Sequence, residues 1–218
     1  MSSKIESAVK YFPPSGAFFK IPEVNYLGKP HTFRLFENLT KSMNAQQLSD
    51  FYNSEKQKGN PYPANSLIIY SLMSSAVKSG NSSLLNFLKD SVRKKYPNAL
   101  SKIVYFPNGN GKAVHNFGTP DEFCLYGKHL NGDEGYIKNL SNIEDILRIT
   151  LGIKDVKKLN EISQGIDQTQ MYLLRINSKS SEKQERLVRF NAYSDRFYLS
   201  CYRDLPDEFP AFQVLQVD

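Results

Sequence analysis

Residues 97–117 read PNALSKIVYFPNGNGKAVHNF, and this stretch decides the fold class. Before it, apolar residues recur at the spacing of a helix. Within it, residues 102–106 and 112–117 are rich in β-branched and aromatic side chains, as strands are. They flank residues 107–111, whose Asn and Gly favour a tight turn, so the segment predicts a β-hairpin.

Three consecutive helices are expected before the hairpin. Asn44 suits the N-cap of the first, Gly80 the end of the second, and Ser82 the N-cap of the third. The apolar residues of each form one stripe. The expected helices cover residues 44–58, 64–79 and 83–96. Because the connections between them are short, the sequence predicts an N-terminal helical cluster with antiparallel neighbours.

The first 40 residues are rich in proline, glycine and aromatic residues. Residues 3–11 fit a short helix, and residues 32–39 fit a strand. The aromatic residues between them indicate a strap that lies across the body of the protein.

After the hairpin, residues 118–139 are expected to form a long polar loop. Ser141 and Glu144 match the capping box S-x-x-E, which predicts a helix that ends near Gly152. A short helix is expected over 155–163. The remaining segments have the composition of strands: 169–177, 186–193, 196–203 and a final edge strand at 211–217.

This order favours an α+β fold with antiparallel pairing over a parallel α/β fold. The expected architecture is an N-terminal helical cluster, then a hairpin, a short helical segment and a C-terminal antiparallel strand meander. Two regions are compatible with it, a mainly helical 1–100 and an α+β 101–218, and so is a single interlocked domain.

The composition is that of an ordinary globular protein: 218 residues, 40% hydrophobic and 23% charged. The longest apolar run is far shorter than the ~20 residues that a membrane span needs, so no membrane association is expected. Met1 to Glu6 lack the apolar core of a signal peptide. Together with two cysteines, expected to be reduced thiols, this predicts a soluble cytoplasmic protein.

Positive charge is concentrated in the middle of the chain. Residues 61–113 hold seven Lys or Arg against Asp90 alone, a surplus equal to the net charge of +6 of the whole chain. Such a surplus attracts polyanions. The expected nucleic-acid contacts are on a basic helical face within residues 78–112: Lys89, Arg93, Lys94, Lys95 and Lys102. Lysines also gather at helix C-termini because they interact favourably with the helix dipole, and this alternative stays open.

The C-terminal strands supply a second candidate surface. Alternation places Tyr172, Leu174 and Ile176 with the core and a row of arginines and tyrosines on the opposite face. That face would hold Arg175, Arg189, Asn191, Tyr193, Arg196, Tyr198 and Tyr202. Aromatic and guanidinium groups on an open sheet are what single-stranded nucleic acids stack on. The same residues also suit any half-exposed sheet.

The third candidate is a group of titratable residues between positions 115 and 134. His115 and His129, with Asp121 or Glu122, could act as acid and base in a hydrolase or nuclease. Their spacing matches no zinc motif, and no metal site is assigned.

No motif identifies a reaction, a cofactor or a family. The expected function is nucleic-acid binding, to DNA or RNA. The alternatives are a metal- or His-dependent hydrolase centred on residues 115–134, and an assembly protein with an acidic protein partner.

Overall fold

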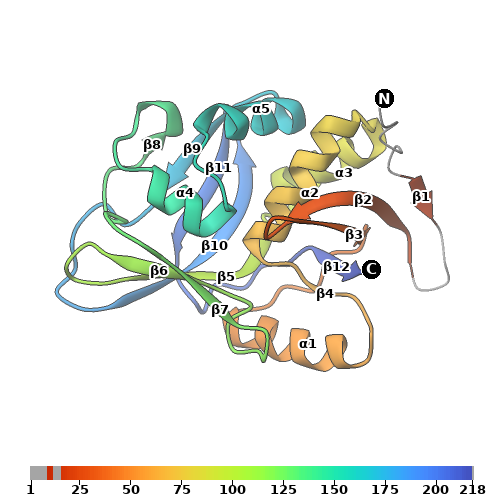
Figure 1. Cartoon of the computed structure of the whole chain (residues 1–218), viewed down its shortest axis with the longest axis horizontal. Coiled ribbons are helices and arrows are strands. Elements are labelled where there is room, and N and C mark those ends of the chain that lie inside the picture. Colours follow the sequence, from red (N-terminus) through yellow and green to blue (C-terminus); the bar gives the residue numbers. More distant parts are fainter. Residues whose placement is uncertain (1–8, 12–15, 218) are drawn as a thin grey trace.

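The computed structural model describes residues 9–11 and 16–217. This part of the chain forms five α-helices and two β-sheets, which confirms the α+β class (Figure 1). Within it, none of the helices has both the length and the apolar character needed to cross a bilayer.

The larger sheet has the strand order β7-β6-β5-β10-β11-β9-β8. Its strands are β5 (Asn98–Tyr105), β6 (Gly111–His115), β7 (Phe123–Gly127), β8 (Gly135–Tyr136), β9 (Gln170–Leu174), β10 (Gln184–Tyr193) and β11 (Arg196–Arg203). The predicted hairpin is confirmed as β5 and β6, and Phe106 N–H donates to the Asn110 carbonyl at 2.9 Å across its turn. The expected polar loop at 118–139 is wrong, because β7 and β8 lie inside it.

The expected antiparallel meander needs correction. β10 and β11 form an antiparallel hairpin, but β9 runs parallel to β11. From β9 the chain passes to β10, which pairs with β5, and β11 then fills the place between β10 and β9. β10 thus pairs with the free edge of β5, whereas in a meander it would have paired with β9.

The two faces of β9 are also the reverse of those expected. Met171 and Leu173 are buried, whereas Tyr172 and Leu174 are only partly buried. Because side chains alternate along a strand, a shift of one residue moves the whole set to the other face. Tyr172 therefore lies on the outer face of the sheet.

The smaller sheet has the order β1-β2-β3-β12-β4. Its strands are β1 (Val9–Tyr11), β2 (Phe18–Tyr26), β3 (Lys29–Phe36), β4 (Tyr62–Pro63) and β12 (Gln213–Gln216). The expected helix at 3–11 falls mostly outside the described residues, and its last three form β1. The expected final edge strand is β12, but it lies inside the sheet, between β3 and β4. The division of the chain near residue 100 stays a prediction.

The helices are α1 (Ala45–Gln57), α2 (Ser66–Ser79), α3 (Ser82–Lys94), α4 (Glu144–Leu151) and α5 (Val156–Asp167), with a 3-10 turn at Ile137–Asn139. Asn44 forms a capping box with Gln47, and Gly80 ends α2 in a left-handed conformation, as predicted. Asn81 rather than Ser82 caps α3. The predicted capping box at Ser141 does not form, since α4 begins after Ile143 without a side-chain cap.

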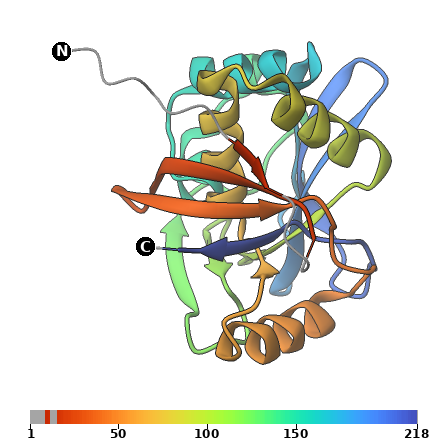
Figure 2. The same ribbon diagram turned by 90° about the vertical axis from the view of Figure 1, so that its right-hand side faces the viewer.

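The three N-terminal helices do not form one cluster. α2 contacts α3, whereas α1 packs on β4 and β5. Figure 2 shows α1 on one side of the smaller sheet, with α2 and α3 on the other. β4 lies between α1 and α2 in the sequence, and its pairing with β12 separates the two helices.

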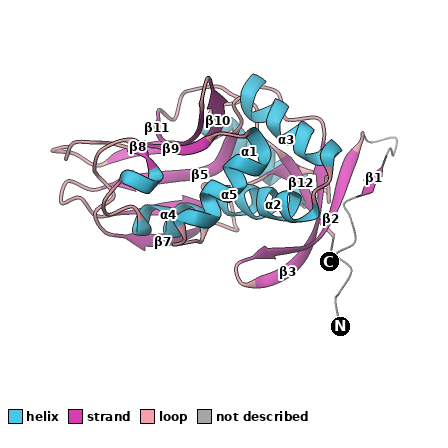
Figure 3. Cartoon of the chain, turned by 90° about the horizontal axis from the view of Figure 1, so that it is seen from above, coloured by secondary structure: helices cyan, strands magenta, loops and turns pink. Residues whose placement is uncertain are grey.

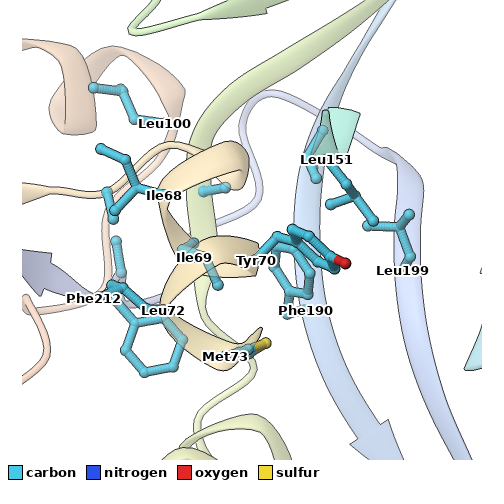
Figure 4. Close-up of a cluster of buried hydrophobic side chains, with 14 of the residues drawn as sticks. Ile68, Ile69, Tyr70, Leu72, Met73, Leu100, Leu151, Phe190, Leu199 and Phe212 are labelled. Atoms are coloured by element: carbon cyan, nitrogen blue, oxygen red, sulfur yellow. The ribbon is translucent and has the colours of Figure 1, made fainter. Parts of the chain in front are cut away.

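Helix α2 lies at the centre of the hydrophobic core. Figure 4 shows Leu72 beside Phe212, which precedes β12, while the ring of Tyr70 points toward Phe190 and Leu199 on the larger sheet. Leu72, Phe190, Leu199 and Phe212 are each at most 1% exposed. Burial of an apolar side chain contributes about 1.5–3 kcal/mol, so this helix holds the two sheets together.

Candidate nucleic-acid interface

The basic helical face is largely neutralised by acids. Nε and Nη2 of Arg93 both donate to the carboxylate of Asp167, which is fully buried. Lys94 lies 3.1 Å from Asp90. Lys102 lies 2.7 Å from Glu185 on the neighbouring strand.

Lys89 and Lys95 form no ion pair within the described residues. Two lysines do not make the continuous basic face that was expected. The charge count over residues 61–113 left out acids from the second half of the chain, such as Asp167 and Glu185.

Two of the expected surface arginines are buried. Arg175 is 5% exposed, and its guanidinium donates to the carbonyls of Asp133, Ser141 and Asn142 at 3.3–3.4 Å. Arg189 is 2% exposed, because the chain after β11 covers it. These positions are corrected: neither arginine is open to a ligand.

The environment of Arg189 explains its burial. Its Nε donates to Asn98 Oδ1 at 2.9 Å, and its Cζ lies 3.5 Å from the ring centroid of Phe209. Burial and the nearby charge of Arg203 lower its pKa to about 10, while Asp207 opposes the shift. The guanidinium therefore anchors the segment that leads to β12.

The expected catalytic group is not assembled. His115 is fully buried, and both of its ring nitrogens are occupied: Nε2 is 2.8 Å from the Ile149 carbonyl and Nδ1 is 2.8 Å from Ser101 Oγ. A carbonyl only accepts, so Nε2 carries the proton and Nδ1 accepts from the hydroxyl of Ser101. Burial lowers the pKa of His115 to about 4. The residue therefore links strands to α4 and cannot reach a substrate.

The other members of that group also have structural contacts. Asp121 accepts hydrogen bonds from Lys56 and Tyr52 at 2.8 and 3.0 Å, and the Lys56 contact lowers its pKa. Glu122 accepts from the N–H of Gly118 at 2.8 Å, while His129 is exposed. Across residues 16–217, no three His, Cys, Asp or Glu side chains converge as metal ligands would.

The outer face of β8, β9 and β11 carries a row of tyrosines. Tyr136 is the partner of Tyr172, and Tyr172 is the partner of Tyr198, on adjacent strands. Their ring centroids are 5.3 and 5.5 Å apart. Asn191 on β10 continues the row as the partner of Tyr198. Cross-strand partners point to the same side, so the four side chains share one face.

Arg196 lies in the next row of the same face. Its Cζ is 4.5 Å from the ring centroid of Tyr172 and 5.4 Å from that of Tyr136. Its cross-strand partners are Gln170 on β9 and Tyr193 on β10. Tyr193 is 67% exposed. We call these seven residues of the two rows the tyrosine face.

Three buried polar atoms at this face have no hydrogen-bond partner in the described structure. They are Oδ1 of Asn191, Nε of Arg196 and Oγ of Ser200, whose residue is fully buried. Each unpaired buried polar group costs about 1–3 kcal/mol of stability.

An open hollow of about 520 Å³ adjoins the tyrosine face at Tyr136. Its lining is almost entirely polar: Tyr136, Lys138, Asn139, Gln164, Gln168, Thr169, Gln170 and Asp195. Side-chain amides both donate and accept, as the edges of nucleobases do. Lys138 adds a cation beside them.

Of the surface residues expected on the sheet, four lie on the tyrosine face: Asn191, Tyr193, Arg196 and Tyr198. The sequence did not predict the places of Tyr136, Tyr172 and the amides of the hollow in this surface. The opposite assignment of the two faces of β9 would have placed Tyr172 on the outer side of the sheet. Tyr136 lies on β8, in a segment that was expected to be a loop.

No protein-family model, curated protein or solved structure matches the chain.

Proposed function

We propose that the protein binds single-stranded nucleic acid on the tyrosine face. The observation that carries the proposal is the Tyr136–Tyr172–Tyr198 row with Arg196 against two of its rings. Bases stack on aromatic rings whatever their sequence, and each such contact is worth about 1–3 kcal/mol. A guanidinium beside the rings can contact either a base or a phosphate.

The amide hollow next to Tyr136 supports a preference for unpaired bases. Watson–Crick edges are free to bond with Gln164, Gln168 or Asn139 only when a base is not in a duplex. We therefore expect single strands to bind better than duplexes of the same length.

The charge of the face sets the salt dependence. Arg196 and Lys138 are the two cations at the face and its hollow, and Asp195 partly offsets them. Two phosphate contacts on a single strand give a slope of about −1.4 in log K against log salt. This is a shallow dependence, much weaker than a basic helical face would produce.

The test is the fluorescence anisotropy of labelled ten-nucleotide RNA, DNA and duplex titrated with protein at several salt concentrations. Tyr198→Ala should weaken binding by roughly 5- to 150-fold, from the loss of one stacked base. Tyr198→Phe should retain most of the affinity, because stacking does not need the hydroxyl.

Tyr126→Ala is the matched control. Tyr126 is 64% exposed on β7 at the far edge of the same sheet, and Lys112 lies 5.8 Å from its ring centroid. A second control, Lys95→Glu, tests the helical face. Absence of binding at 100 µM protein and low salt would refute the proposal. So would an equal loss in Tyr126→Ala, or a large loss in Lys95→Glu with none in Tyr198→Ala.

A further inference from the structure

A second cavity, of about 510 Å³, lies along α2. One wall is the β2–β3 hairpin, and the other is formed by the end of α4 and the start of α5. Figure 3 shows this hairpin projecting beside α2. The cavity lies in another part of the fold from the tyrosine face and shares no lining residue with the amide hollow.

One end of the cavity is apolar. Leu67 in the first turn of α2, Leu151 at the end of α4 and Leu27 at the hairpin tip line it. A Cβ added at Gly152 would lie 3.3 Å from Leu67, so α4 ends against the start of α2. Leu27 is 58% exposed, and its φ of 51° is a conformation that leucine rarely adopts.

The floor of the cavity is a row of hydroxyl groups. Ser71, Ser74 and Ser75 follow one another on the face of α2 that lines the cavity. Tyr70, on the same face, is 7% exposed, and its hydroxyl has no hydrogen-bond partner among the described residues. Figure 4 shows the ring directed away from α2, toward Leu151 and Leu199. Tyr70 thus offers one fixed donor that no protein group uses.

Charges of both signs line the cavity. Lys78 lies in the last turn of α2, Lys158 and Glu161 on α5, and Glu23 on β2. Among the described residues none of these four forms an ion pair. A fatty acid or a nucleotide could pair with Lys78 or Lys158 but would leave Glu23 and Glu161 without a counter-ion, whereas a ligand with both an ammonium and a carboxylate would find partners for each.

We propose that this cavity binds a short peptide with free ends and an apolar side chain at one end. The eleven-residue step along α2 from Leu67 to Lys78 spans about 16 Å, which is the length of about five extended residues. The apolar side chain lies among the leucines, and the main chain runs over the serine row. The Tyr70 hydroxyl donates to a peptide carbonyl, and the carboxylate end of the peptide lies near Lys78.

The test is an affinity selection. The full-length protein is incubated with a library of random pentapeptides with free ends, and bound peptides are recovered by ultrafiltration and identified by mass spectrometry. We expect enrichment of peptides with Leu, Ile, Phe or Met at one end. The enriched peptides are then titrated calorimetrically, with and without blocked ends.

Ser74→Trp fills the cavity and should weaken binding by more than tenfold. Ser83→Trp places the same side chain on the exposed first turn of α3 and should leave binding unchanged. Tyr70→Phe removes one hydroxyl, which should weaken binding about three- to tenfold without changing the fold. Thermal unfolding of each variant shows whether it is folded.

The proposal is overturned if the wild type retains no peptide more strongly than the folded Ser74→Trp variant does. It is also overturned if Tyr70→Phe binds as tightly as the wild type, or if blocking both ends of an enriched peptide has no effect. Tyr70 packs on the inner face of the larger sheet, toward Leu199, whereas the tyrosine face is the outer side of that sheet. Oligonucleotide binding by the Ser74 and Tyr70 variants should therefore equal that of the wild type, which keeps the two proposals separable.

Discussion

Lowering the pH from 7.5 to 4.5 should destabilise the protein through His115. In the folded state, burial holds the pKa of this imidazole at about 4, against 6.5 for a free histidine. Between these values the unfolded chain binds a proton that the folded chain does not. The free energy of unfolding therefore has its full value above pH 6.5, falls as the pH drops toward 4, and changes little below that through this group.

The geometry explains why protonation is costly. Nε2 already donates to the Ile149 carbonyl, and Nδ1 accepts from Ser101 Oγ. A second proton on Nδ1 removes the acceptor that the Ser101 hydroxyl needs and places a charge at a fully buried position. The Ser66 N–H donates to Ser101 Oγ at 2.9 Å, so the disturbance reaches the first turn of α2.

The expected magnitude follows from the two pKa values. One pKa unit corresponds to about 1.4 kcal/mol, and integration from pH 7.5 to 4.5 gives a loss of roughly 2.5 kcal/mol. That is a large fraction of the stability of about 5–15 kcal/mol that a typical domain has.

The assay is urea unfolding followed by circular dichroism at four pH values, for the wild type and for His115→Gln. The glutamine amide can form both hydrogen bonds and does not titrate. Both proteins have the same carboxylates, so their contribution cancels in the difference between the two free energies of unfolding. His129→Gln, at an exposed position, is the control and should retain the wild-type pH dependence. A wild-type minus His115→Gln difference that stays constant within 0.5 kcal/mol would refute the reasoning, as would an NMR titration of His115 with its midpoint above pH 6.

Three further substitutions test the packing. Arg93→Ala leaves the buried carboxylate of Asp167 without its cation and should cost on the order of 2–4 kcal/mol in urea unfolding. Gly132→Ala places a methyl group against the guanidinium of Arg175 and should cost about 1–3 kcal/mol by the same assay. Leu27→Asn relieves the left-handed conformation at the hairpin tip and should stabilise the fold by about 1 kcal/mol, seen as a higher Tm.

Helix positions could be predicted from the sequence because their signals are local. Asn44 caps α1 through a hydrogen bond to Gln47, three residues away, and glycine at position 80 is needed for a left-handed end. The box at Ser141 failed for a reason that is not local. The carbonyls of Ser141 and Asn142 accept hydrogen bonds from Arg175, which keeps this segment outside the helix.

The tyrosine face could be predicted only in part, because strand register is a property of the whole sheet. On β9 the alternatives were Met171 and Leu173 inside, or Tyr172 and Leu174 inside, and both pairs are apolar enough for a core. The parallel pairing with β11 decides between them. No residue within β9 carries that information.

The surplus of cations in residues 61–113 has a different meaning in the folded chain. Arg93 contacts Asp167, and Lys102 contacts Glu185, so two of its cations meet acids from the acidic half of the sequence. Opposite charges that are segregated along a chain attract across the contact between its two halves. Such a surplus indicates a polyanion site only after the pairs that folding creates have been subtracted. Lys89 and Lys95 are the expected contacts that keep no acidic partner among the described residues, and they do not form a continuous face. The surface that we propose for the ligand consists instead of aromatic and amide groups, with Arg196 and Lys138 as its cations.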